Sequence, residues 1–397
     1  MSRKQSTLFE GDRMGFTEAL EMTKQSLIAY ALKYRHWVFA YSGGKDSSAT
    51  LTAVIYLILE GEVPMPESIT VLYADTRLEI PPLQAAAMAM LAELKKRGIK
   101  TEIVLPPIDD RFFVYILGRG VPPPSNTFRW CTPQLKIEPM ERALLNLRER
   151  IGQKLLMITG VRLGESAARD QRISISCGKN GAECGQGWLQ ISTPEAVADT
   201  LAPILHWRVC FVWDWLMFFA PSKGFPTQII AEAYGGDEAE EINARTGCMC
   251  CNLASTDRAL DEVIKIPRWN YLLPIKELRS IYAELKKPCN RLRKDGTETT
   301  KEGDLVANPN RMGPLTFEAR ISGLERILDI QTRVNQARGS MPEISLINAD
   351  EENRIRELIS LKQWPNGWDG TEPLASEPFD EVMKDGSVQP IMKELCE

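Results

Sequence analysis

Histidine is nearly absent from this chain: His36 and His206 are the only two among 397 residues. Histidine is the side chain most often used as a general base near neutral pH. Both histidines lie in or beside strongly apolar segments, a setting that favours a buried structural role. The sequence therefore offers no evident general base, and its chemistry is expected to depend on positioning and electrostatics.

Long apolar runs are also lacking. The first 15 residues contain no apolar segment of the kind that a secretory signal needs, so we do not expect secretion. The most apolar stretch, residues 201–220, is interrupted by His206, Arg208 and Asp214. Such polar groups are costly at the centre of a bilayer, so we interpret this stretch as a buried strand followed by a helix. The sequence predicts a cytoplasmic protein with no membrane partner.

A large excess of one charge is absent as well. The 48 Lys and Arg residues nearly balance the 53 Asp and Glu residues, which gives a net charge of −5. This excludes a bulk polycation that coats DNA and leaves only local basic patches as nucleic-acid contacts. One such patch lies at residues 286–294, inside a stretch, residues 286–313, that is predicted to be an exposed loop. The patch is either a phosphate-tracking surface or a solvated loop without a ligand.

Nine cysteines in a chain of this length, without a signal peptide, indicate thiols or metal ligands in a reducing compartment rather than a disulfide framework. Cys248 and Cys251 form a Cys-x-x-Cys pair, and Cys177 and Cys184 flank a Gly-rich loop suited to wrapping a cluster. Iron–sulfur clusters use thiolates from a short paired motif and from more distant positions. Zinc is the alternative, because four thiolates suit it equally.

Strands and helices alternate in the first part of the chain. We expect strands at residues 37–41, 69–73, 101–105 and 155–159, with helices that end at Gly61 and Gly98. This alternation predicts an α/β fold with a doubly wound, mostly parallel sheet. We divide the chain into residues 1–235 as the sheet domain, 236–300 as a cysteine-cluster and basic-loop region, and 301–397 as a helical C-terminal region. Helices are expected at 315–338 and 350–362, and a loosely ordered tail from Pro365.

A Gly-rich segment lies between the first predicted strand and its helix. Two glycines let the backbone approach a phosphate, and the amides at a helix N-terminus then converge on the anion. Lys45 adds positive charge, and Asp46 either orients the loop or helps to hold Mg²⁺. The spacing is not that of a Walker A loop, and a Gly-Gly turn that only caps the helix is the alternative. The segment consists of Ser42, Gly43, Gly44, Lys45, Asp46 and Ser47.

This segment, Asp75 and Arg162 all fall at the ends of predicted strands. Ligands of parallel sheets bind beyond the carboxyl ends of the strands, so we expect these groups to share one site.

The Ser-Gly-Gly-Lys-Asp-Ser segment resembles the PP-loop of ATP pyrophosphatases. That family cleaves ATP between the α and β phosphates, releases pyrophosphate and leaves AMP on the activated atom. The resemblance implies an adenine nucleotide alpha hydrolase-like fold with a cysteine-bearing insertion. It also implies ATP and Mg²⁺ as ligands, with the pyrophosphate portion held by residues 42–47.

Three further segments resemble the PAPS reductase superfamily. They are Arg-x-Cys at residues 129–131 with Leu-Lys and Pro at 135–139, Gly-x-Arg at 160–162 with Glu-Ser at 165–166, and Pro-Ile with later tryptophans at 203–216. Four cations in or beside these segments are expected to bind phosphate or sulfate oxygens through charge-assisted hydrogen bonds. These cations are Arg129, Lys136, Arg162 and Arg169.

Within the superfamily, residues 75–81, 128–132 and 245–251 are most similar to DNA phosphorothioation enzymes of the DndC/SspD type. In that family a PP-loop enzyme with an iron–sulfur cluster helps to replace a non-bridging DNA phosphate oxygen by sulfur. The resemblance implies adenylylation of the phosphate oxygen, release of pyrophosphate, and displacement of AMP by sulfur. The implied partners are DNA, a cysteine desulfurase that donates sulfur, and other phosphorothioation subunits.

The resemblance also implies residue roles. The catalytic set would be Lys45, Asp46, Asp75 and Arg162. Adenylylsulfate reductases carry a Cys-Cys pair where this chain has Cys131 and Thr132, which leaves the fourth ligand of the implied [4Fe–4S] cluster open. The predicted ligands are Cys131, Cys184, Cys248 and Cys251, with Cys177 as the alternate.

Three other functions compete with this interpretation. A PAPS or adenylylsulfate reductase of sulfate assimilation would use a C-terminal Cys-Gly-Leu-His sequence, whereas this sequence ends Lys-Glu-Leu-Cys-Glu, with Cys396 a weak substitute. A tRNA thiolation enzyme shares the PP-loop but fits the Arg162 and Arg169 element poorly. A nucleotide-binding scaffold without activity is disfavoured because Lys45 and Asp46 are both present.

Overall fold

The computed structural model of the chain describes residues 15–164, 171, 182–183, 188–190, 197–234, 248–294, 312–382 and 388–391. The chain forms two compact units, each assembled from separate segments. Unit 1 consists of Met1–Ala74, Pro81–Val104 and Met140–Thr246. Unit 2 consists of Asp75–Ile80, Leu105–Pro139 and Gly247–Glu397. The division into residues 1–235, 236–300 and 301–397 stays a prediction.

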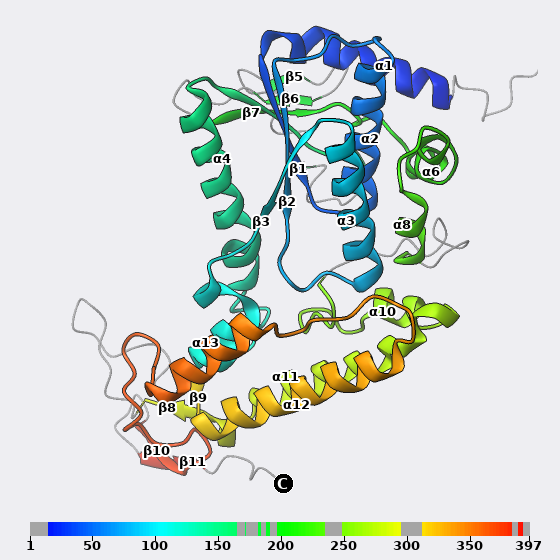
Figure 1. The fold of residues 1–397 in the computed structure, drawn as a ribbon. Coiled ribbons are helices and arrows are strands. Elements are labelled where there is room, and N and C mark those ends of the chain that lie inside the picture. The colour runs from blue at the N-terminus through cyan, green and yellow to red at the C-terminus, as the bar shows by residue number, and fades with distance from the viewer. Residues whose placement is uncertain are drawn as a thin grey trace, which may run out of the picture. The chain divides into compact units, whose positions relative to one another are not determined.

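Unit 1 is built on a seven-stranded sheet with the order β3-β2-β1-β4-β7-β6-β5. The first five strands run parallel, and β6 and β5 extend the sheet antiparallel (Figure 1). The chain winds outward from β1 in both directions, which confirms the predicted α/β fold with a doubly wound, mostly parallel sheet. The strands are β1 (His36–Tyr41), β2 (Ser68–Ala74), β3 (Lys100–Val104), β4 (Leu155–Ile158), β5 (Ala182–Glu183), β6 (Trp188–Gln190) and β7 (Ala198–Ala202).

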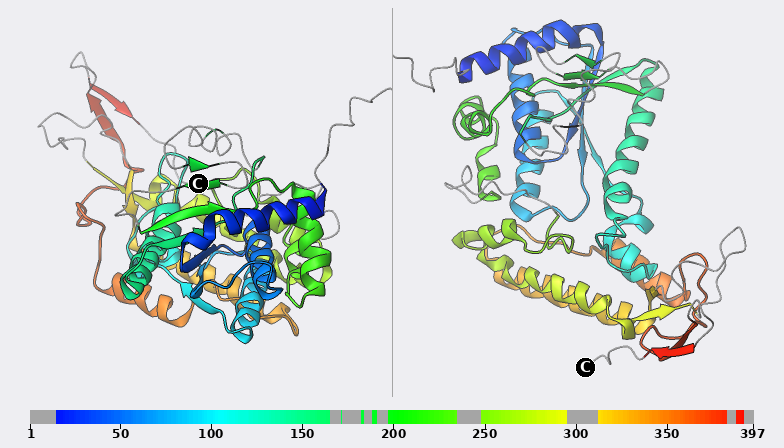
Figure 2. Two further views of the ribbon diagram at one scale, coloured as in Figure 1. Left: turned by 90° about the horizontal axis from the view of Figure 1, so that it is seen from above. Right: turned by 180° about the vertical axis from the view of Figure 1, so that it is seen from behind.

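Helices cover both faces of this sheet. Figure 2 shows α2 (Lys45–Leu59) and α3 (Pro81–Lys96) on one face and α4 (Glu138–Ile151) on the other. Gly61 and Gly98, which follow α2 and α3, have φ values of +76°, as expected for glycines that end helices. The side chains on the α4 face of the sheet form a small core with Leu147 of α4. The larger core lies on the opposite face, where α1 (Phe16–Tyr30) also packs.

The apolar stretch at residues 201–220 is a strand followed by helix, as predicted. After β7 come α6 (Val209–Asp214) and a π-helical turn, η5 (Trp215–Phe219). His206 lies just before them with its Nε2 2.9 Å from the Ala19 carbonyl oxygen, and burial lowers its pKa. This neutral, packed imidazole has the structural role expected from the sequence. Within the described residues, no helix is both long and apolar enough to cross a membrane.

Unit 2 is largely helical. Its longest helix is α12 (Phe317–Ala337), which packs against α11 (Leu278–Leu285) and the 3₁₀ segment η7 (Pro267–Glu277). A π-helical turn, η3 (Val114–Gly118), contacts α13 (Ala349–Ser360). The helices predicted at 315–338 and 350–362 are therefore confirmed. The other elements of unit 2 include the 3₁₀ turn η2 (Ile108–Asp110), the π-helical turn η4 (Pro133–Ile137), α10 (Arg258–Val263) and η8 (Pro288–Asn290).

Two sequence expectations for unit 2 are wrong in part. Residues 286–313 were expected to form an exposed loop, but Arg291–Arg293 form strand β8, which pairs with β9 (Met312–Leu315). Leu292 and Arg293 are only 5% and 4% exposed, because the strand pairing buries this basic segment. In the tail that was expected to be loosely ordered, β10 (Phe379–Val382) and β11 (Val388–Ile391) form an antiparallel pair.

Arg320 anchors the core of unit 2. Its side chain is fully buried, and its guanidinium donates to the carbonyl oxygens of Leu315, Gly118 and Gln363 at 3.0, 3.3 and 2.7 Å. The rings of Phe317 and Trp364 each lie 4.5 Å from the guanidinium carbon. One charged group thus joins three chain segments.

We predict that Arg320→Leu lowers the free energy of unfolding by about 3 kcal/mol or more, because three carbonyl groups lose their buried donor. Arg326→Leu on the same helix is the control. Arg326 pairs with the exposed Glu284, and an exposed ion pair contributes about 0–1 kcal/mol. Urea denaturation of the full chain measures both. Equal losses in the two variants would contradict the anchoring role.

Candidate active site

The predicted phosphate-binding segment of unit 1 joins the central strand β1 to helix α2. Gly43 has φ +75°, a left-handed conformation that favours glycine, and a Cβ atom there would lie 3.3 Å from that of Ala87. Gly44 is the extended N-cap of α2. The hydroxyls of Ser42 and Ser47 lie 3.0 Å apart, and the Ser47 hydroxyl donates to the Gly44 carbonyl. The first amides of α2 have no partner within the helix and point toward its positive end.

Asp46 is held between two cations. Its Oδ1 lies 2.5 Å from Nε of Arg162, and its Oδ2 lies 3.1 Å from Nζ of Lys45. Arg162 is only 5% exposed and also donates to the Trp207 carbonyl at 3.2 Å. Both carboxylate oxygens are thus engaged, so this geometry favours the orienting role of Asp46 over a role as Mg²⁺ ligand. Arg162 lies against Asp46, and its predicted role in binding phosphate or sulfate oxygens stays a prediction.

Gly160 lets two loops meet. It follows β4, which neighbours β1 in the sheet, so the loops after the two strands emerge side by side. A Cβ atom on Gly160 would lie 2.7 Å from the Asp46 carbonyl carbon and from the Ser47 nitrogen. Only glycine permits this approach of two backbones. The sequence singled out Gly160 by resemblance alone, and the structure supplies the steric reason.

Tyr234 is a site residue that the sequence analysis missed. Its hydroxyl accepts the Lys45 amide hydrogen at 3.2 Å, and the Lys45 ammonium lies 5.1 Å from the centre of its ring. The tyrosine is 3% exposed and follows the short helix α8 (Gln228–Glu232). A cation over an aromatic face is attracted by the ring quadrupole, so Tyr234 helps to fix the lysine. No spacing or motif in the sequence connects it with the loop.

The remaining predicted cations and Asp75 belong to unit 2, except for Arg169, which lies outside the described residues. Asp75 is 7% exposed, and its Oδ1 accepts the Arg77 amide hydrogen at 2.8 Å. Arg129 is exposed and donates to Asn126 at 3.0 Å. Lys136 is exposed, and its charge acts on two neighbours, Glu79 and Cys248. Their roles as catalytic or anion-binding groups stay predictions.

Three of the predicted cluster ligands, Cys131, Cys248 and Cys251, belong to unit 2. The Cys251 amide donates to the Cys248 carbonyl at 3.1 Å, which closes a turn. Burial raises the pKa of Cys248 to about 11; Lys136 opposes this, whereas Glu79 and the other two thiols add to it. Burial also raises the pKa of Cys131, and Cys251 adds to that shift. The thiols are therefore close enough to influence each other electrostatically.

This set is nonetheless incomplete as a metal site. In the parts of the chain that the structure describes, no group of three or more His, Cys, Asp or Glu side chains is arranged to hold a metal ion. Cys184 and its alternate Cys177 lie outside those parts. The soft thiolate chemistry suits iron–sulfur clusters or zinc, and ligand thiols lose their protons when a metal binds. The cluster assignment stays a prediction.

Cys250 differs from its neighbours in the Cys-x-x-Cys turn. It is fully buried, its Sγ donates to the Ile275 carbonyl at 3.1 Å, and its amide donates to Asp257 at 2.6 Å. Burial raises its pKa. Cys250 thus holds the turn in place and is a structural thiol.

Part of the chain is similar in sequence to a known family. Residues 36–218 match the sequence model of the phosphoadenosine phosphosulfate reductase domain. This region is therefore similar in sequence to the PAPS reductase domain. A comparison with curated proteins gives no match.

Among solved structures, the chain is similar to a phosphoadenylyl-sulfate (PAPS) reductase from Candida auris, determined as a phosphate complex. The two share 11% sequence identity, with a TM-score of 0.34. The similarity covers 59% of this chain and 96% of the reductase.

We predict that Gly160→Ala lowers the free energy of unfolding by about 3 kcal/mol, since its Cβ meets backbone atoms that cannot rotate away. Gly15→Ala is the control, because the nearest atom to a Cβ there lies at 3.9 Å. Gly15→Ala should lower the free energy of unfolding by less than about 1 kcal/mol. Urea denaturation compares the two variants. An equal effect would show that the close packing of the Gly160 backbone against Asp46 and Ser47 is not needed for stability.

We predict that protein purified without oxygen is brown and contains iron and acid-labile sulfide, and that Cys248→Ser and Cys251→Ser lose both. Cys250→Ala should keep its iron while losing stability, because the Cys250 thiol donates to the Ile275 carbonyl and is not one of the predicted ligands. Elemental analysis and sulfide release measure the metal content. A colourless protein that contains zinc would refute the iron assignment.

Proposed function

We propose that this chain is an ATP pyrophosphatase that activates a DNA backbone phosphate for sulfur incorporation, as in DNA phosphorothioate modification. The observation that carries the proposal is the loop of unit 1. Gly43 and Gly44 join the carboxyl end of the central strand to the start of α2, and Lys45 adds a positive charge there. The loop also lies where the strand order reverses direction, between β1 and β4, which is the usual ligand position in such sheets.

In the proposed reaction, a non-bridging oxygen of a DNA phosphate attacks the α-phosphorus of ATP. The bond from that phosphorus to the bridging oxygen breaks, and pyrophosphate leaves into the loop. Lys45 and the first amides of α2 stabilise the negative charge that develops on the leaving group. Asp46 and Arg162 keep the lysine and the helix start in position, so that little reorganisation is needed during the reaction.

Sulfur enters in the second step. A nucleophilic sulfur supplied by a cysteine desulfurase partner attacks the DNA phosphorus, and AMP leaves with the displaced oxygen. We include a [4Fe–4S] cluster on Cys131, Cys248, Cys251 and Cys184 in the proposal, with Cys177 as the alternate ligand. No step above depends on that cluster. Mg²⁺ would accompany ATP, as it commonly does at phosphate sites.

A second candidate is a reductase of PAPS or adenylylsulfate. The match of residues 36–218 to the phosphoadenosine phosphosulfate reductase domain favours it. In that case the loop would hold a phosphate of the nucleotide substrate, and no pyrophosphate would be released.

We predict that the purified protein converts ATP to AMP and pyrophosphate, and that Lys45→Ala lowers the rate by at least about a hundredfold, as expected for loss of a preorganised charge. Lys96→Ala, in the same unit but 76% exposed, is the control and should keep full activity. Chromatography of the nucleotides identifies the products. ADP and phosphate as products would contradict the mechanism, and sulfite formed from PAPS without ATP cleavage would establish the second candidate.

The sulfur step is tested in cells that contain the partner proteins. Mass spectrometry of nuclease-digested DNA should detect phosphorothioate dinucleotides with the wild-type chain and none with Lys45→Ala. Unmodified DNA in both strains, despite ATP cleavage in vitro, would refute DNA as the acceptor.

A further inference from the structure

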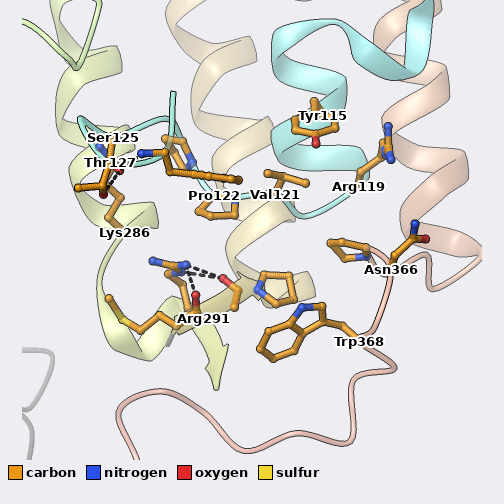
Figure 3. A pocket seen from close by; sticks show the side chains of 16 residues that line it. Tyr115, Arg119, Val121, Pro122, Ser125, Thr127, Lys286, Arg291, Asn366 and Trp368 are labelled. Atoms are coloured by element: carbon orange, nitrogen blue, oxygen red, sulfur yellow. Dashed lines mark hydrogen bonds between the residues drawn. The ribbon is translucent and has the colours of Figure 1, made fainter. Parts of the chain in front are cut away.

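Unit 2 contains a cavity of about 870 Å³ that plays no part in the reaction above. Figure 3 shows that its walls come from the chain after η3, from the β8–β9 region and from the segment around Trp368. Ligand cavities for molecules of nucleotide size have volumes of roughly 300–1,000 Å³. The cavity is thus large enough for a nucleoside phosphate.

Positive side chains line this cavity. Arg119, Lys286 and Arg291 line it, and among the described residues no Asp or Glu belongs to the lining. Arg119 is paired with Asp110 at 3.2 Å. The Lys286 ammonium makes no hydrogen bond or ion pair with the described residues. Such a wall favours an anion.

Arg291 is fixed in place by the backbone. Its Nε donates to the Gly313 carbonyl at 2.9 Å, and its Nη2 donates to Gly313 and Met312 at 2.7 Å each (Figure 3). Nη1 has no partner among the described residues. The guanidinium is therefore fixed at the cavity wall, and its Nη1 remains available to donate. A fixed guanidinium with an available donor suits the binding of a phosphate oxygen.

Aromatic rings lie beside these cations. Tyr115, Phe128 and Trp368 line the cavity, and the Phe128 side chain is 48% exposed. A tight turn presents Phe128, because its amide donates both to the carbonyl and to the hydroxyl of Ser125, each at 3.1 Å. Exposed rings next to cations are the usual platform for unpaired bases, since every base has a π face that can stack.

We propose that this cavity binds a nucleoside phosphate with an unpaired base, as part of a single-stranded nucleic acid. Lys286 and Arg291 contact the phosphates, and the base stacks on Phe128. A paired base in a duplex is covered by neighbours on both faces, so it must leave the stack to enter. The basic segment at residues 286–294 thereby contributes two contacts inside a cavity rather than a long surface track.

The cavity also adjoins the cysteine turn. The Asn252 side chain donates to the Pro124 carbonyl at 2.9 Å, which ties the residue after Cys251 to the cavity-bearing loop. Lys286 and Cys251 are close enough to interact electrostatically. A bound strand would therefore lie next to these thiols. That such a strand takes part in sulfur transfer rests on the proposed function. That the strand binds in the cavity rests only on the residues of unit 2.

Fluorescence anisotropy with a labelled twelve-nucleotide thymidine strand tests the proposal on the full-length protein without ATP. We expect Lys286→Ala and Phe128→Ala each to weaken binding about tenfold. Two controls should bind like wild type: Lys287→Ala, an exposed neighbour outside the cavity lining, and Phe218→Ala, which removes a 67% exposed ring in unit 1. Lys286→Ala should also reduce the slope of log affinity against log salt by roughly 0.7.

Several outcomes would overturn the proposal. They are equal losses in Lys286→Ala and Lys287→Ala, equal binding of the strand and its duplex, or thymidine monophosphate binding as tightly as the strand. Lys45→Ala should bind the strand like wild type, so failure of ATP cleavage and failure of strand binding are distinguishable.

Discussion

The carboxylate of Asp46 is the group on which the candidate active site of unit 1 depends. It occupies the first turn of α2, where the helix dipole favours negative charge, and it pairs with both Lys45 and Arg162. Without it the two cations would repel each other, and the nearly buried guanidinium would lose its counter-charge at a cost of about 3–5 kcal/mol. The arrangement therefore keeps two positive charges at one loop before any nucleotide binds.

The sheet order makes this arrangement possible. Because β4 pairs with β1, the Gly160 backbone meets the start of α2, and Arg162 follows two residues later. A side chain at position 160 would push the loops apart and separate the Asp46 and Arg162 partners. The strand order, one glycine and one ion pair thus act together, and none of them would position Lys45 alone.

The sequence predicted the parts of this structure that local patterns determine. The strand–glycine–helix segment at residues 42–47 and the helix ends at Gly61 and Gly98 depend on neighbouring residues, so they were visible in advance. Tyr234 was not, because it meets Lys45 from 189 residues away in the chain. The buried strand at Arg291–Arg293 was missed for a similar reason. Two arginines in three residues are typical of a solvent-exposed loop. In the structure their strand pairs with β9, and the carbonyls of Gly313 and Met312 accept hydrogen bonds from Arg291.

The distribution of charge in unit 2 explains how a chain with a net charge of −5 can present a site for anions. Many arginines there are neutralised by carboxylates: Arg111 by Glu351, Arg354 by Asp109, and Arg333 by Glu277. Lys286 is an exception at the cavity, whose described lining residues include no acid. Net charge describes the whole surface, whereas binding depends on the few cations that the fold leaves without a counter-charge. A protein that is not a bulk polycation can therefore still bind an anion at one selective site.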